Sequence, residues 1–264
     1  MPGINRKKAM KTKRRKTADR SDKNKDELLI SVCLIVRNEE KYIEQCLRSV
    51  KRVADEIVLV DTGSTDRTVE IARKFTDRIY FHPWQDSFSE ARNHYLTYAR
   101  GKWIFQIDVD EELVREDVPL VRPALADPDV DAVSVQIISY ARQGQGKGVH
   151  CVERLFRNNG DIRYEGRVHN RLVGIKNPSL SKIRLRHYGY DLAGGESEKK
   201  FQRTEGLLKK DLEENPGNPY THHYLSCSYL SREMYDRVVF HGHEALQRGM
   251  LAELGAGNGS ANLE

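Results

Sequence analysis

The feature that most constrains the fold is a regular alternation of apolar runs and amphipathic segments in the first half of the chain. The first two runs do not alternate with polar residues, which is typical of strands buried on both faces. Apolar residues between the runs recur at helical spacing. We therefore predict an α/β fold with a parallel central sheet and right-handed crossovers. The four predicted strands are Leu28 to Val36, Ile57 to Val60, Arg78 to His82 and Trp103 to Ile107.

The helices between these strands have recognisable limits. The helix after the first strand is marked by Ile43, Cys46, Leu47 and Val50. The next is predicted to end at about Phe75. Ser87 and Glu90 form a capping box that opens a third helix, which is expected to run to about Ala99 and to stop at Gly101.

Polar side chains follow three of the predicted strands. Arg37-Asn38-Glu39 follows the first, Asp61 ends the second, and Asp108 and Asp110 follow the fourth. Ligands of open α/β sheets bind at the carboxyl ends of parallel strands. We therefore predict a binding site at this edge of the sheet.

The segment Asp108-Val109-Asp110 is the strongest candidate for a metal site. Residues i and i+2 of an extended chain point to the same face, so both carboxylates can meet one cation. Two hard oxygen donors together with a diphosphate suit Mg²⁺ or Mn²⁺. A solvated acidic turn is the alternative, and the place of the pair at the end of a buried strand favours the metal.

Other candidate residues each have a plain structural alternative. In the loop after the second strand, Ser64 or Thr65 can cap the following helix, which is a purely structural role. Asp61 and Glu39 differ, because their places at strand ends allow them to accept hydrogen bonds from a base or a ribose. Arg154 and Arg157 are spaced to hold phosphate or to form a solvated rim. Arg92 alone is a surface arginine, and His169 alone is more often a structural histidine than a metal ligand.

Charge is unevenly distributed over the 264 residues. Residues 1–28 carry eleven Lys and Arg against four acids, whereas the remainder has 33 basic and 35 acidic residues. The pI near 8.9 therefore belongs to the tail, and nucleic acid is an unlikely partner of the near-neutral body. We predict a disordered basic tail over residues 1–27.

Composition also limits the cellular setting. No apolar stretch approaches the length of a membrane span, and no apolar segment follows the basic start as in a secretory signal. The four cysteines include no C-x-x-C pair, which argues against a zinc knuckle or a disulfide framework. We expect a cytoplasmic protein.

The second half of the sequence is less regular. Strands are predicted at Asp131 to Ser139, Val152 to Phe156 and Ile183 to His187, with a glycine-rich loop over residues 143–148. From Glu196 the pattern becomes helical, with breaks at residues 215–219 and around Arg232. The predicted division is a catalytic domain over 28–192, helices over 193–250 and a flexible end over 251–264.

Taken together, the motifs resemble the family 2 glycosyltransferases of the GT-A fold. The resemblance is carried in order by residues 31–40, 60–68, 91–93 and 107–111. Further motifs narrow it to a bacterial branch in which tetratricopeptide-like helices follow the catalytic domain. They are Phe81-His82-Pro83-Trp84, Arg154 to Asn158, Glu165 to His169, and His187-Tyr188-Gly189-Tyr190.

The resemblance implies an inverting transfer of a sugar from a nucleotide-sugar donor, foremost a UDP-sugar, to an unidentified acceptor, which is a glycan, lipid or peptide. The metal, Mn²⁺ or Mg²⁺, is expected to act as a Lewis acid on the leaving diphosphate. The implied nucleotide-sugar residues are Val36, Asn38, Glu39, Asp61, Arg92, Asp108, Arg154 and Arg157. The implied metal ligands are Asp108, Asp110 and His169.

An inverting transfer needs a general base near the acceptor. Many members of the family carry it in a late Glu-Asp pair, which this chain lacks. We predict Glu165 as the base, with Glu112 second. The related branch often has Glu after its Val-His pair, where this chain has Asn170.

Three alternatives compete with this interpretation. One is a degenerate transferase domain that serves as an interaction module. Another is a sugar-phosphate nucleotidyltransferase, which prefers a glycine-rich loop after the first strand, whereas Arg37 to Glu40 contains no glycine. The third is nucleic-acid binding through the tail, which is at most an accessory role.

The tail itself suggests a surface. Eleven basic residues are expected to attract anionic lipid headgroups, at roughly 1 kcal/mol for each residue near the membrane. We therefore predict a peripheral association with the inner face of a membrane.

Overall fold

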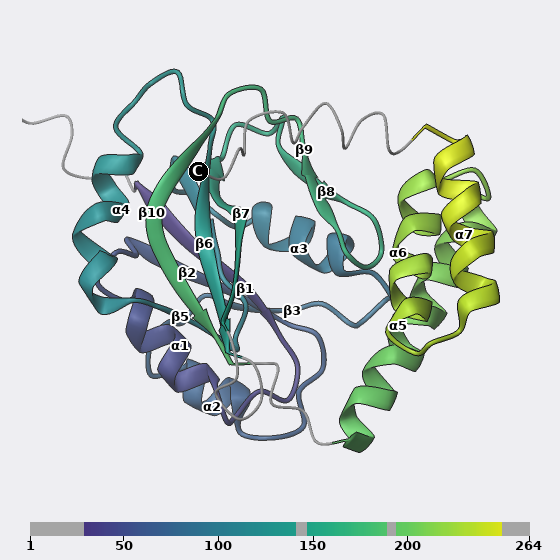
Figure 1. The fold of residues 1–264 in the computed structure, drawn as a ribbon. Helices are drawn as coiled ribbons and strands as arrows, with labels where there is room; N and C mark the ends of the chain where they lie inside the picture. The colour runs from purple at the N-terminus through teal and green to yellow at the C-terminus, as the bar shows by residue number, and fades with distance from the viewer. Residues whose placement is uncertain (1–28, 141–146, 189–193, 250–264) are drawn as a thin grey trace, which may run out of the picture.

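The computed structural model describes residues 29–140, 147–188 and 194–249. Its centre is an eight-stranded sheet with the order β3-β2-β1-β4-β7-β6-β10-β5 (Figure 1). Only β5 and β7 run antiparallel to their neighbours, so the predicted mostly parallel α/β sheet is confirmed. The strands are β1 (Ile30–Val36), β2 (Glu56–Asp61), β3 (Ile79–Phe81), β4 (Trp103–Gln106), β5 (Glu111–Leu113), β6 (Ala132–Tyr140), β7 (Lys147–Arg157) and β10 (Pro178–His187).

Helices cover both faces of this sheet. Alternate residues of β1 belong to different cores because successive side chains of a strand point to opposite faces. Val32 and Leu34 pack with α1 (Ile43–Val50) and α4 (Val118–Ala124), whereas Cys33 packs with α3 (Phe88–Leu96) and the small hairpin of β8 (Arg163–Glu165) and β9 (Arg171–Val173). The short elements α2 (Thr68–Ala72) and η1 (Arg115–Asp117) also belong to this part of the chain.

The helix α3 begins as its capping box predicts. The Glu90 amide donates to Ser87 Oγ at 3.2 Å, so Ser87 is the N-cap. The helix ends at Leu96, earlier than the predicted Ala99. Gly101 then permits a close crossing of β1, because a Cβ atom there would lie 2.6 Å from the Ser31 amide nitrogen.

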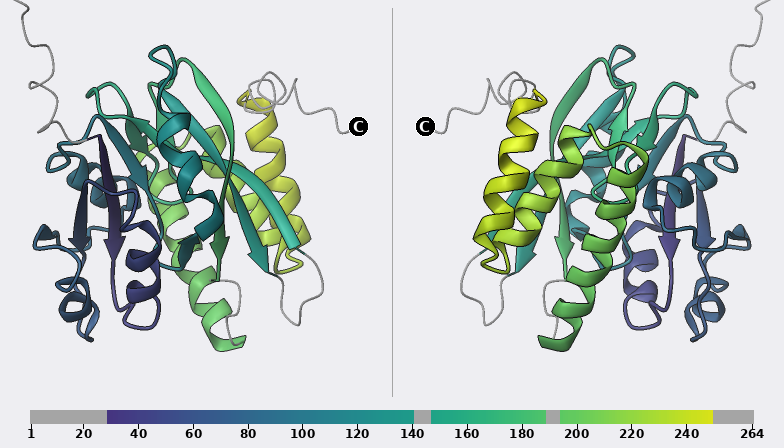
Figure 2. Two further views of the ribbon diagram at one scale, coloured as in Figure 1. Left: turned by 90° about the vertical axis from the view of Figure 1, so that its left-hand side faces the viewer. Right: turned by 90° about the vertical axis from the view of Figure 1, so that its right-hand side faces the viewer.

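Three helices follow the sheet and lie together on one side of it (Figures 1 and 2). They are α5 (Gly194–Glu214), α6 (Pro219–Leu230) and α7 (Tyr235–Gln247), and both predicted breaks are present. The helices α6 and α7 lie side by side, where Ser226 Oγ donates to the Val238 carbonyl at 3.0 Å.

Several predictions differ from the structure. The strands β5, β8 and β9 were not predicted, because each has three residues and no apolar run. The strand β7 is longer than the predicted 152–156 and includes residues 147–148 of the predicted glycine-rich loop. Residues 143–146 of that loop, the tail 1–27 and the segment 251–264 lie outside the described residues.

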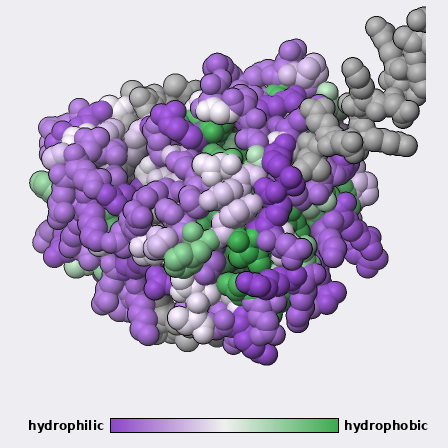
Figure 3. Space-filling view, turned by 180° about the vertical axis from the view of Figure 1, so that it is seen from behind, coloured by the Kyte–Doolittle hydropathy of each residue, from purple (hydrophilic) through white to green (hydrophobic). Residues whose placement is uncertain are grey.

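The face opposite to that in Figure 1 is mostly hydrophilic, with a group of hydrophobic residues in its lower half (Figure 3). Among the described residues, no helix combines the length and the apolar character that a membrane span requires.

Candidate functional site

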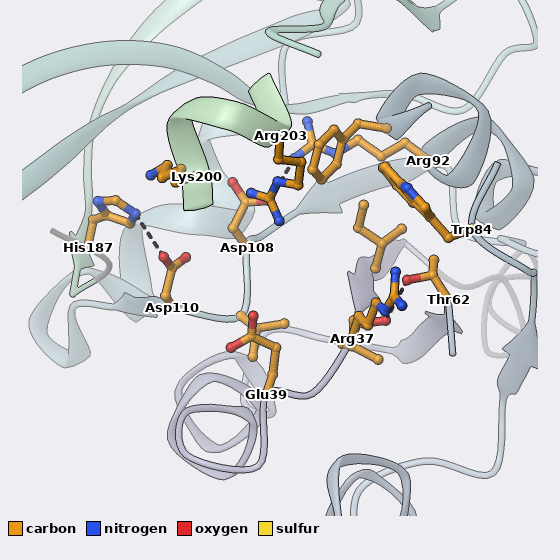
Figure 4. Close-up of a pocket in the computed structure, with 14 residues that line it drawn as sticks. Arg37, Glu39, Thr62, Trp84, Arg92, Asp108, Asp110, His187, Lys200 and Arg203 are labelled. Atoms are coloured by element: carbon orange, nitrogen blue, oxygen red, sulfur yellow. Dashed lines mark hydrogen bonds and ion pairs between the residues drawn. The ribbon is translucent and has the colours of Figure 1, made fainter. Parts of the chain in front are cut away.

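A cavity of about 380 Å³ opens at the carboxyl edge of the parallel strands, where the sequence places a binding site. Strand ends form one side of it and α5 of the helical segment the other (Figure 4). The lining residues are Ile35, Val36, Arg37, Glu39, Thr62, Trp84, Phe88, Arg92, Asp108, Val109, Asp110, His187, Lys200 and Arg203.

Asp108 lies at the centre of a charged network. Its Oδ1 accepts from Arg92 Nη2 at 2.7 Å, and its Oδ2 accepts from Arg154 Nη2 at 2.9 Å. Burial alone would raise the pKa of Asp108, but the two guanidinium groups outweigh it and hold the pKa below its usual range. Asp108 is therefore an ionised carboxylate whose two oxygens are both engaged.

The two arginines of the predicted phosphate pair have different places. Arg154 is buried beneath Asp108, where it also pairs with Glu111 at 2.5 Å and donates to Gln106. Arg157 lies at the opposite edge of the sheet, with its guanidinium over the Trp103 ring at 4.3 Å. Neither Arg154 nor Arg157 lines the cavity. Of the three arginines predicted to bind the nucleotide sugar, Arg92 is the one that lines it.

Asp110 faces a histidine that is distant in sequence. Its Oδ2 lies 3.0 Å from His187 Nε2, and its carbonyl accepts from the Tyr188 amide at 2.9 Å. The register explains the contact, because His187 at the end of β10 pairs with Glu111 of β5, the next residue after Asp110. Burial alone would lower the pKa of His187, but the hydrogen bond and charge of Asp110 raise it.

Asp110 and His187 are the described residues of the cavity that could together hold a divalent cation. Two cis ligands, each about 2.1 Å from an octahedral ion, lie about 3.0 Å apart, which matches the Oδ2 to Nε2 distance of 3.0 Å. Among the described residues no group of three or more His, Cys, Asp or Glu side chains is arranged around a metal position. Other ligands would therefore come from a bound molecule and water, the usual mode for Mg²⁺ at substrate phosphates.

Glu39 is the other acid of the cavity. Burial, together with the charges of Asp110 and Asp66, raises its pKa to about 7, although Arg203 acts in the opposite direction. The amide of Glu39 donates to Thr68 Oγ1 at 2.7 Å, which connects the segment after β1 to the start of α2. Near pH 7 the carboxyl group of Glu39 is therefore partly protonated.

The remaining residues predicted for the nucleotide lie at or beside the cavity. Val36 lines it directly. Asn38 follows β1 and Asp61 ends β2, both beside the cavity: Asn38 Oδ1 accepts from the Thr65 amide at 2.7 Å, and Asp61 Oδ1 accepts from the Ser64 amide at 3.1 Å. Thr62, the neighbour of Asp61, is the residue of that loop that lines the cavity.

His169 and Glu165 lie elsewhere. Both line a smaller cavity of about 130 Å³ against α5 and α6. The His169 ring stacks on Tyr224 at 4.4 Å, and Glu165 pairs with Arg163 at 2.6 Å. The histidine beside Asp110 is thus His187, whereas the ring of His169 packs against the helical segment.

Glu112, the second predicted base, is on the side of β5 that faces α1. Its Oε2 accepts from Tyr188 Oη at 2.5 Å and from Gln45 Nε2 at 3.0 Å. Asn170 is closer to the network, because its Oδ1 accepts from Arg92 Nη1 at 2.8 Å, the same guanidinium that holds Asp108. An amide therefore stands where the related branch often has Glu.

Sequence reasoning missed several lining residues. Trp84 and His187 belong to motifs that support the family resemblance. The sequence therefore marked both residues but did not indicate that they line the site. Phe88 follows the N-cap of α3 and contacts Trp84 edge-on at 4.8 Å. Lys200 and Arg203, three apart on α5, had no signal, because only helix docking brings them to the sheet.

Comparison with known proteins identifies the class. The sequence model of the family described as "Glycosyl transferase family 2" matches residues 31–175, more than half of the chain. The chain is 32% identical over 203 residues to a TPR repeat-containing protein of Synechococcus elongatus, with 72% of this chain and 50% of the relative covered. It is 31% identical over 197 residues to the SPbeta prophage-derived glycosyltransferase SunS of Bacillus subtilis, with 72% and 46% covered.

The chain therefore belongs to glycosyl transferase family 2, and the predicted class of transferase and the GT-A fold are confirmed. Among solved structures, S. aureus TarS 1-349 in complex with UDP-GlcNAc is similar at a TM-score of 0.49 and 15% identity, covering 70% of this chain and 67% of that chain. The chain spans about half the length of the curated relatives it matches.

Proposed function

We propose that this chain transfers a sugar from a nucleotide-sugar donor, foremost a UDP-sugar, with inversion at the anomeric carbon. The observation that carries the proposal is the Asp110–His187 pair at 3.0 Å, inside a cavity that also holds the ionised Asp108 and several cations. The cavity lies where open α/β sheets bind their ligands. Family membership supports the reaction class.

In this proposal each residue has a defined task. Val36 and Thr62 contact the base, with Glu39 and Asp61 on the ribose side, and Asn38 holds the two loops together. Asp108 is fixed by Arg92 and Arg154 and accepts from the ribose. Asp110 and His187 hold Mn²⁺ or Mg²⁺, which as a Lewis acid would neutralise the diphosphate. One nitrogen and one oxygen ligand favour Mn²⁺ over Mg²⁺, because Mg²⁺ prefers oxygen alone.

The general base is proposed as Glu165, with Glu112 second. Because Glu165 pairs with Arg163 outside the donor cavity, it would have to approach the acceptor when both substrates bind. Glu165→Gln is expected to lower turnover strongly with little change in donor affinity. Activity near that of the wild type would remove Glu165 from this role, and the same assay on Glu112→Gln would then test the second candidate.

The test of the proposed function is nucleotide binding by calorimetry, followed by donor turnover. UDP, GDP and CDP are titrated with Mn²⁺, Mg²⁺ or EDTA, and hydrolysis of the matching nucleotide sugars is measured. One nucleoside diphosphate should bind in a metal-dependent way. Asp110→Asn and His187→Gln should abolish that dependence, whereas Asp129→Asn, on an exposed loop, should not. If no nucleotide binds, the proposal is wrong.

A second candidate function has its own observation. Asn170 at the Arg92–Asp108 contact, and the absence of both predicted bases from the cavity lining, favour a domain that binds a donor without transferring it. Tight nucleotide binding without turnover of any donor would support this interaction module. The nucleotidyltransferase alternative has no supporting observation here.

The acceptor and the cellular site stay proposals. A peripheral position at an anionic membrane is proposed from the basic tail alone. Deleting residues 1–26 should weaken binding to anionic vesicles and leave turnover of a soluble donor unchanged.

A further inference from the structure

The cavity receives two cations from a part of the chain that the catalytic sheet does not contain. Lys200 and Arg203 lie on α5, in the helical segment, and both line the cavity that holds Asp108, Asp110 and Glu39. Figure 4 shows them on the other side of the cavity from Glu39 and Arg37. The helical segment therefore forms a wall of the site.

The arginines near the cavity differ in whether protein carboxylates already pair with them. Arg92 is occupied by Asp108 and Asn170, and Arg154 by Asp108 and Glu111. Arg203, in contrast, makes no ion pair with a described carboxylate, and its guanidinium lies 5.7 Å from the centre of the Phe88 ring. Arg203 also lines the cavity, across from Glu39 (Figure 4).

The place of α5 is held by contacts outside the cavity. Arg167, in the loop between β8 and β9, forms an ion pair with Glu214, and Lys210 forms one with Asp86. Farther along the interface, Arg171 lies over the Tyr220 ring at 4.1 Å. These contacts at the far end of α5 and on α6 fix the helix, so Lys200 and Arg203 are held above the strand ends.

We propose that Arg203 and Lys200 bind the diphosphate of the donor and stabilise the negative charge that develops on it. This rests on the proposed function. In the transfer, the bond between the anomeric carbon and the phosphate oxygen breaks, and its electron pair leaves with the diphosphate. The acceptor atom forms the new bond to that carbon and gives its proton to the base. Fixed cations aimed at the growing charge lower the barrier.

The proposal makes the helical segment part of the catalytic unit. A guanidinium presents two parallel donors to phosphate oxygens, whereas an ammonium acts as a point charge. Arg203 is therefore assigned the directed contact, and Lys200 is assigned the electrostatic one. A domain cut after the last strand would keep Asp110 and His187 but lose both cations.

The test compares UDP with uridine, which lacks the phosphates. Arg203→Gln, Lys200→Gln and the double variant are titrated calorimetrically with each probe in the presence of Mn²⁺. Lys199→Gln, on the same helix but away from the cavity, is the matched control. Each single variant should bind UDP about tenfold more weakly, because one charged contact to phosphate is lost, and the double variant should bind it more weakly still. Uridine binding should stay unchanged.

The outcomes separate the two proposals. Wild-type and variant proteins that bind UDP equally well overturn the assignment of α5 and leave the proposed function standing. Equal losses for UDP and uridine also overturn it, because the effect would then lie outside the diphosphate. A wild-type protein that binds no UDP contradicts the UDP donor and this assignment together.

Discussion

At the scale of single residues, the site depends on how Asp108 is compensated. Arg154 is the residue that holds both Asp108 and the buried Glu111, and it does so from beneath the cavity. The spacing of Arg154 and Arg157, three residues apart, suggested phosphate binding. Burial decides otherwise, because Arg154 is only 7% exposed and already pairs with Asp108 and Glu111.

Replacing Arg154 by Met should therefore destabilise the protein. The change leaves Glu111, only 2% exposed, without its counter-ion, and breaking a buried pair costs about 3–5 kcal/mol. Urea unfolding measures the loss. Arg163→Met is the control, since Arg163 is 59% exposed and its pair with Glu165 contributes at most about 1 kcal/mol. Equal losses in both variants would contradict the buried network.

The carboxyl group of Glu39 predicts a pH dependence. Its pKa rises from 4.5 to about 7 on folding, so between these values the folded protein keeps a proton that the unfolded chain releases. Stability should therefore fall as pH rises from 4.5 to 7, relative to Glu39→Gln. Thermal melts of both proteins across this range test it, and parallel curves would show that the Glu39 pKa is not raised.

At the scale of elements, the connection from α3 to β4 contains a close backbone crossing at the start of β1, the end of the sheet opposite to the site. The helix α3 carries Arg92 and β4 leads to Asp108, so this connection joins the two elements whose side chains meet at 2.7 Å. Asn93 strengthens the arrangement, because its side chain exchanges two hydrogen bonds of 2.9 Å with the backbone of Tyr164.

Gly101→Ala should disturb this junction. The new Cβ would lie 2.6 Å from the backbone nitrogen of Ser31, and overpacking of this kind costs about 1–3 kcal/mol. Chemical denaturation measures the change. Gly206→Ala on α5 is the matched control with the opposite sign, because nothing lies within 4 Å and alanine favours a helix by about 1 kcal/mol. A neutral Gly101→Ala variant would show that β1 can shift away.

At the scale of the whole molecule, the site exists only where the sheet and the helical segment meet. The ends of β1, β4 and β10 and the helices α3 and α5 all bring charged or titratable side chains to the cavity. The small hairpin of β8 and β9 packs against α5 and α6, so His169 and Arg171 contribute to docking.

Reversing one docking charge should loosen the helical segment. Lys210→Glu places a negative charge beside Asp86, a repulsion of up to about 1 kcal/mol at an exposed pair, or about fivefold faster amide exchange in α5. Hydrogen-exchange mass spectrometry measures it. Lys209→Glu is the control, because Lys209 pairs within its own helix at 2.7 Å. Equal exchange in the two variants would remove the Lys210–Asp86 pair from docking.

Local patterns were sufficient for the first parallel strands and for the breaks between the later helices. The uninterrupted apolar runs of β1 and β2, the Ser87 cap and the breaks before α6 and α7 are effects of neighbouring residues, which sequence spacing records directly. The strand-end rule then placed Glu39, Asp108 and Asp110 at one edge. Each of these inferences needs only the chain within a few residues of itself.

The completed site was decided by tertiary structure. His187 reaches Asp110 across 77 residues through the pairing of β10 with β5, and Arg203 reaches the cavity through the docking of α5. The same packing takes Arg157 to the far edge and His169 onto Tyr224. Sequence determined which side chains end each strand, because that follows from local burial. Only the long-range pairing of strands and helices could decide which of them share one cavity.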